Sequence, residues 1–137
     1  MKKLWLAAVL ALAPFAMNAQ TLTVVNNTSC PVDYHVYADP ACTSGSFYNI
    51  NPVTVAPMST DVISTLPGGP MPAGFVWNAP PPPGSVFDIF KVVTTATAVV
   101  GEPCTPWPLM TKFQCGATIF VDWIAVSPGN FQVDIHY

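Results

Sequence analysis

Residues 118–137 of the chain are Thr118-Ile119-Phe120-Val121-Asp122-Trp123-Ile124-Ala125-Val126, Ser127-Pro128-Gly129-Asn130 and Phe131-Gln132-Val133-Asp134-Ile135-His136-Tyr137. The first run is apolar at nearly every position and rich in β-branched and aromatic residues, which is typical of a strand covered on both faces. The last run alternates apolar with polar residues, which is typical of a strand with one buried and one solvated face. Pro-Gly supplies turn chemistry between the two runs. The stretch therefore predicts a β-hairpin.

The position of Asp122 selects the register of this hairpin. A simple loop pairs Val126 with Phe131 and places Asp122 on the core face, where a carboxylate without a partner costs several kcal/mol or more. One β-bulge shifts the pairing by one residue and exchanges the two faces. We therefore predict the bulged register, in which Asp122 lies outside beside Asp134 and His136. The residues that then join the core are Ile119, Val121, Trp123 and Ala125.

The first twenty residues have the three parts of a signal peptide. Two lysines precede an apolar run from Leu4 to Phe15, and Ala19 is a small residue at the expected cleavage point. We predict a signal peptide at residues 1–19 and one β domain at residues 20–137. The apolar run is short for a membrane span, so no transmembrane segment is expected in the mature chain. The start and the Ala-Gln junction resemble those of exported proteins of Gram-negative bacteria, which implies a secreted protein, in the periplasm, at the cell surface or outside the cell.

The predicted mature chain carries little charge. Lys91 and Lys112 are its only basic residues and arginine is absent, against seven acidic residues. Nucleic-acid binding requires clustered Lys and Arg, so a nucleic-acid partner is not expected. A surface with so few charges favours association, and we expect a protein or glycan partner or self-association.

All four cysteines lie in the predicted exported part, which predicts two disulfides among Cys30, Cys42, Cys104 and Cys115. Pairing of neighbours in sequence closes short loops, each worth roughly 3 kcal/mol. A strand between Cys30 and Cys42 would hold them about 20 Å apart at about 3.3 Å per residue, whereas a disulfide needs Cα atoms about 5.5 Å apart. Cys30 would then pair with Cys104 or Cys115, and both connectivities stay open.

Short strand-like runs separated by Pro and Gly fill the rest of the domain. Residues 66–84 form a Pro/Gly segment that ends in Pro80–Pro83, a stiff polyproline II strap. No helical period occurs outside the leader. The pattern predicts an all-β fold, an antiparallel β-sandwich of immunoglobulin-like or jelly-roll type, with a closed barrel as the alternative. The expected strands are 21–25, 32–38, 46–50, 53–56, 61–65, 74–78, 85–93 and 94–100, with the terminal hairpin.

The stretch from Thr21 to Ala38 resembles the start of thaumatin-like domains. Those domains also run from an apolar strand through Asn and Cys into a strand that ends near Val-aromatic-Ala, here Val36-Tyr37-Ala38. The present chain is shorter and has fewer cysteines, so the resemblance implies no function.

Two Asp-x-His steps are the sharpest local feature of the sequence. Asp33 and His35 lie two apart, as do Asp134 and His136, so each pair shares one strand face. If the two strands are neighbours, two imidazoles and two carboxylates converge into a ligand set that zinc or copper accepts. The alternative is that both strands show polar residues to water.

Three aromatic residues lie in or beside loops, where flat rings stack on sugars or on a protein partner. These residues are Tyr37, Trp77 and Trp107. The alternative is that such rings close the ends of a core.

Enzyme signatures such as a nucleophile elbow, a phosphate loop or a zinc-protease motif do not occur, so we expect no catalytic residue and no cofactor. We interpret the chain as a secreted, non-enzymatic β-sandwich that acts by binding or assembly. A small metal-binding exported protein, with or without catalytic activity, is the second interpretation.

Overall fold

The computed structural model describes residues 20–40, 47–93, 98–101 and 109–137, and all regular structure in these ranges is β. The strands are β1 (Thr21–Asn26), β2 (Val32–Asp39), β3 (Phe47–Tyr48), β4 (Val53–Val55), β5 (Ser59–Ser64), β6 (Val86–Val92), β7 (Ala98–Val100), β8 (Leu109–Gln114), β9 (Ala117–Ser127) and β10 (Asn130–His136). The predicted all-β class is therefore confirmed. No helix in the described ranges combines the length and apolar character needed to cross a membrane.

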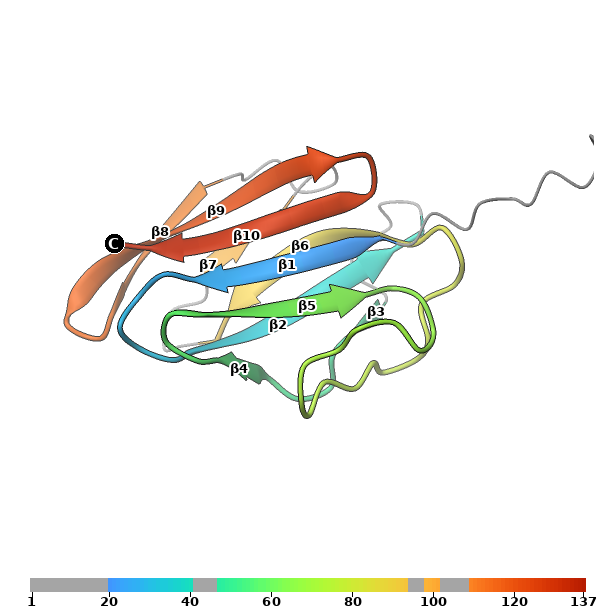
Figure 1. Ribbon diagram of the computed structural model, residues 1–137, viewed down its shortest axis with the longest axis horizontal. Helices are drawn as coiled ribbons and strands as arrows, with labels where there is room; N and C mark the ends of the chain where they lie inside the picture. Colours follow the sequence, from blue (N-terminus) through green and yellow to red (C-terminus); the bar gives the residue numbers. More distant parts are fainter. Residues whose placement is uncertain (1–19, 41–46, 94–97, 102–108) are drawn as a thin grey trace, which may run out of the picture.

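The strands form two sheets that lie one over the other (Figure 1). The first sheet has the order β5-β1-β10-β9-β8. The second has the order β3-β2-β6-β7, with β4 also paired to β2. Neighbouring strands are antiparallel except for β1 and β10, which run parallel in the middle of the first sheet.

The core lies between the sheets because alternate residues of each strand point inward. In β1 and β2 this alternation is regular, and Tyr34 of β2 is fully buried. Its ring stacks on Phe90 at 5.0 Å between centroids, and its hydroxyl donates a hydrogen bond of 2.8 Å to Asp61 of β5. The buried hydroxyl is thus satisfied, as a polar group in a core must be.

The hairpin of β9 and β10 has the predicted bulged register. The pairing shifts between Asn130 and Phe131, so that Asp134 lies opposite Asp122 and Val133 opposite Trp123. Ile119, Val121 and Trp123 are buried, as predicted, and Asp122 is outside. Two expectations are wrong: Ala125 is exposed, and β9 is covered on one face only, since Ile124 on the outer face and Val126 at the bulge are exposed. Apolar composition therefore did not mean burial on both faces.

The described disulfide joins Cys30 to Cys115, with Cα atoms 6.2 Å apart. Pairing of Cys30 with its sequence neighbour Cys42 was the wrong alternative, because β2 carries the chain away from Cys30. Cys42 and Cys104 lie outside the described residues, as do residues 94–97 of the predicted strand 94–100, whose remaining residues form β7. Cys115 and Gly116 form the turn between β8 and β9, with φ of 55° and 80°.

The segment between β5 and β6 crosses from the first sheet to the second. Of the predicted strand 74–78, only Trp77 pairs, in an isolated bridge with Asn49 beside β3. Hydrogen bonds from Asn78 N to Tyr48 O (2.8 Å) and from Ile50 N to Val76 O (2.9 Å) hold this segment to the edge of the second sheet.

Candidate functional site

The outer face of the first sheet carries apolar side chains on β8 and β9. Register pairs these strands so that Leu109 lies opposite Asp122 and Phe113 opposite Thr118, which puts them on the side away from the core. Phe113 is 71% exposed and Val126 is 62% exposed. We call the set of Leu109, Phe113, Phe120 and Ile124 on this face, together with the exposed bulge residue Val126 at its end, the β8–β9 patch.

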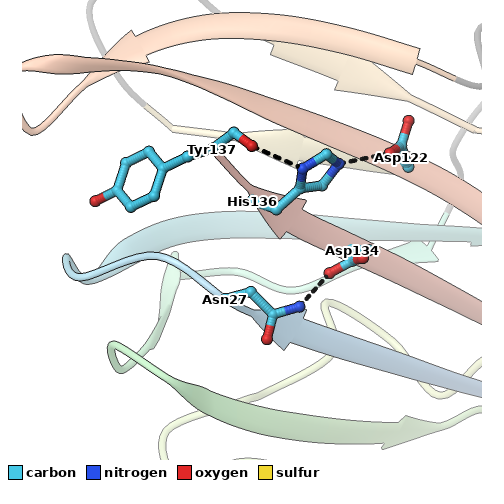
Figure 2. Close-up of polar contacts among 5 residues, drawn as sticks. All are labelled: Asn27, Asp122, Asp134, His136 and Tyr137. Atoms are coloured by element: carbon cyan, nitrogen blue, oxygen red, sulfur yellow. Dashed lines mark hydrogen bonds and ion pairs between the residues drawn. The ribbon is translucent and has the colours of Figure 1, made fainter.

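A polar cluster adjoins this patch on the same face, at the C-terminal end of β10 (Figure 2). His136 Nε2 lies 2.8 Å from Asp122 Oδ2, and its ring stacks on Phe120 with centroids 5.5 Å apart. Asn27 donates a hydrogen bond of 2.7 Å to Asp134. The cluster thus places two carboxylates and one imidazole directly beside an aromatic ring of the patch.

The contacts of His136 favour its doubly protonated form. Nε2 faces the Asp122 carboxylate and Nδ1 faces the Tyr137 carbonyl oxygen at 3.1 Å. Both partners are acceptors, and a neutral imidazole has only one N–H to donate. The hydrogen bond to Asp122, followed by that to the Tyr137 carbonyl, raises the pKa of His136 above its ordinary value of 6.5.

This geometry predicts a pH dependence of stability. Because the folded state binds the proton of His136 more tightly, the contribution is fully present below pH 6.5 and is lost as pH rises through the raised pKa. The His136 side chain is 37% exposed, so we expect its ion pair with Asp122 to contribute less than about 1 kcal/mol to the free energy of unfolding. Asp122→Asn should lower the pKa of His136 in an NMR titration and remove most of this dependence in urea unfolding. Asp33→Asn, on the second sheet, is the control, and an unchanged His136 titration in Asp122→Asn would contradict the assignment.

The structure does not bring the two Asp-x-His steps together. Asp33 and His35 belong to β2 in the second sheet, whereas Asp134 and His136 belong to β10 in the first. Asp33 accepts a hydrogen bond from Thr54, and His35 Nδ1 lies 3.0 Å from the carbonyl oxygen of Asn49. In the described ranges no three His, Cys, Asp or Glu side chains form a group able to hold a metal ion. The condition for the four-ligand site, neighbouring strands, is not met.

The two described aromatic residues that were predicted to stack on a ligand, Tyr37 and Trp77, each pack against a different ring of the protein. Tyr37 contacts Tyr48 on the second sheet, with ring centroids 5.8 Å apart, and desolvation raises its pKa. Trp77 packs edge-on against Phe75 at 4.9 Å. Trp107 lies outside the described residues.

Trp77 also lines a cavity of about 240 Å³ under the Pro/Gly segment. Its walls are apolar or neutral: Thr65, Leu66, Pro67, Gly68, Met71 and Pro80 complete the lining. Ligand stacking on Trp77 stays a prediction, and this cavity is where it would occur.

Comparison with known proteins finds no matching family model, no matching curated protein and no matching solved structure.

The β8 part of the patch was missed in the sequence, although a signal for it exists. Leu109, Thr111 and Phe113 alternate with Met110 and Lys112, and the dipeptide Cys115-Gly116 has turn chemistry between this run and β9. The lysine within the run obscures the strand, because it occupies an inward position that apolar residues normally fill.

Proposed function

We propose that this protein is an exported, non-enzymatic β-sandwich of immunoglobulin-like or jelly-roll type that acts by binding or assembly at the cell surface or outside the cell. Two facing sheets with a common core support the sandwich assignment. The leader-like sequence before Gln20 supports export.

The observation that carries the proposal is the exposed β8–β9 patch. Soluble monomers rarely expose large contiguous apolar areas, and such areas mark interaction sites when polar residues surround them. The patch combines aromatic and aliphatic side chains. Asp122 lies within it, between Phe120 and Ile124 on β9, and Asp134 and His136 lie beside it on β10. Protein interfaces combine apolar contact area with a smaller number of polar groups that bond to the partner.

The chemistry of the face also limits the partner. Its described charged groups are carboxylates and one histidine, so phosphate-rich partners are disfavoured. An apolar protein surface that also carries hydrogen-bond donors for Asp122 and Asp134 fits better.

The test compares two lysine variants at valines of similar exposure. Val126→Lys places a charge in the patch, whereas Val76→Lys changes a valine that is 53% exposed on the Pro/Gly segment. We expect Val126→Lys to weaken binding by about tenfold or more, because a charge placed in an apolar interface is desolvated on binding. Binding is measured as co-sedimentation with the envelope fraction of the source cells, and self-association by sedimentation equilibrium. Equal behaviour of Val126→Lys, Val76→Lys and the parent in both assays would reject the β8–β9 patch as the interface.

A further inference from the structure

Among the residues that the structure describes, no strand pairs with the outer edge of β8. β8 is the last strand in the order β5-β1-β10-β9-β8. It joins β9 through the two-residue turn Cys115-Gly116, both with positive φ, which is a type I′ hairpin. The residues that flank such a turn, Gln114 and Ala117, exchange hydrogen bonds, and hydrogen-bonded positions alternate along the strand. The N–H and C=O groups of Leu109, Thr111 and Phe113 therefore face the free edge.

This edge lacks the usual protection on its outer side. β8 contains no proline, and its outward side chains are uncharged. At the opposite edge of the sheet, the N–H of Ser64 in β5 is bonded to the carbonyl of Pro70, 3.0 Å away. The charge on β8, Lys112, points inward and is 9% exposed, and desolvation lowers its pKa. Edge strands without outward charges or prolines are templates for pairing with another strand.

We propose that β8 pairs antiparallel with β8 of a second copy, about a two-fold axis at Thr111. This names the partner for the function proposed above and rests on it. In this register Thr111 lies opposite its own copy and Leu109 lies opposite Phe113 of the copy. The three residues with free edge groups all become bonded, and their side chains form Thr–Thr and aliphatic–aromatic pairs, which stabilise antiparallel sheets. Lys112 lies opposite Met110 of the copy rather than opposite the second lysine.

Charge and size set the expected affinity. β8 contains no Asp or Glu, so two copies of this acidic chain can pair along β8 without repulsion between carboxylates of the two strands. The pairing makes one continuous ten-stranded sheet from two sheets of five. It also joins the two β8–β9 patches across the axis. Six residues per copy bury less than the roughly 800 Å² per partner of a stable interface, so the dimer is weak and concentration-dependent.

Cysteine cross-linking tests the register. Residues in a hydrogen-bonded antiparallel pair have Cα atoms about 5.5 Å apart, within the range of about 4.4 to 6.8 Å that a disulfide spans. Thr111→Cys should therefore give a cross-linked dimer through residue 111 on mild oxidation, identified by peptide mass mapping. Phe113→Cys is the matched control on the same edge, and it should not cross-link to itself. The reverse result, cross-linking of Phe113→Cys but not of Thr111→Cys, would overturn this register.

A backbone variant tests the edge contact itself. Thr111→Pro removes an N–H that bonds to no strand in the described part of the monomer, a change that edge strands tolerate, whereas Thr111→Val keeps it. Loss of the two bonds at the axis should weaken dimerisation about thirty-fold in sedimentation equilibrium. If the parent is monomeric at every concentration, the second-copy inference is wrong, and the Val126→Lys co-sedimentation assay still decides the proposed function. If Thr111→Pro dimerises like the parent while Val126→Lys does not, the copies meet through the patch face and not through the edge.

Discussion

Replacement of Cys30 and Cys115 by alanine is expected to lower the free energy of unfolding by about 4.6 kcal/mol, the chain-entropy value for a loop of this length. The two cysteines are 85 residues apart, so their disulfide restricts most of the domain in the unfolded state. The φ of 55° at position 115 strains cysteine and alanine alike, so it does not change this difference. The measurement is urea unfolding monitored by tryptophan fluorescence.

The control for this experiment is Thr118→Ala, an exposed change next to the same turn, which should alter stability by no more than about 0.5 kcal/mol. If the double variant loses less than about 1 kcal/mol of unfolding free energy, the unfolded chain already holds positions 30 and 115 close together without the disulfide.

Asn26→Ala is expected to destabilise the fold by more than about 3 kcal/mol, since each buried group left without a partner costs about 1 to 3 kcal/mol. Asn26 is fully buried at the end of β1. Its amide nitrogen donates to the carbonyl oxygens of Cys30 (2.8 Å), Ala56 (3.0 Å) and Val55 (3.3 Å). Its oxygen accepts bonds of 3.0 and 2.6 Å from the N–H and hydroxyl of Thr28. One side chain thus ties together β1, the turn before β2 and the end of β4.

Asn27→Ala is the matched control for Asn26→Ala. Asn27 is the next residue, of the same type, but it is exposed and its amide contacts Asp134 at the surface. We expect this variant to lose less than about 1 kcal/mol. Similar losses for the two variants in chemical unfolding would show that burial of the Asn26 amide is not what matters.

The register of the terminal hairpin could be predicted because one residue distinguishes the alternatives. Asp122 is costly inside and harmless outside, so a single carboxylate selected the bulge between Asn130 and Phe131. The same register also predicted that Ala125 is buried, but Ala125 is exposed. Its methyl group has too little apolar surface to require burial. Local chemistry thus specified which residues of β9 and β10 pair. It did not specify how much of this hairpin the second sheet covers.

Features that depend on distant parts of the chain could not be predicted. The sequence left Cys30 with several possible partners, and only the path of β2 and the β8–β9 turn brings Cys115 to it. The predicted metal ligands share a spacing, yet spacing does not say that β2 and β10 enter different sheets. The cluster of Asp122, Asp134 and His136 was anticipated as neighbours on one face, because it follows from the hairpin register alone.

The parallel pairing of β1 with β10 has a consequence for the order of folding. Thr21 pairs with Asn130 and Asn26 with Ile135, so the centre of the first sheet is built from segments more than one hundred residues apart. Contacts of such long range make folding slow, because a large loop must close before they form. Until β10 is in place, β1 and β9 each have an unpaired edge, so a chain that still lacks residues 130–136 exposes two strands that can pair with other chains.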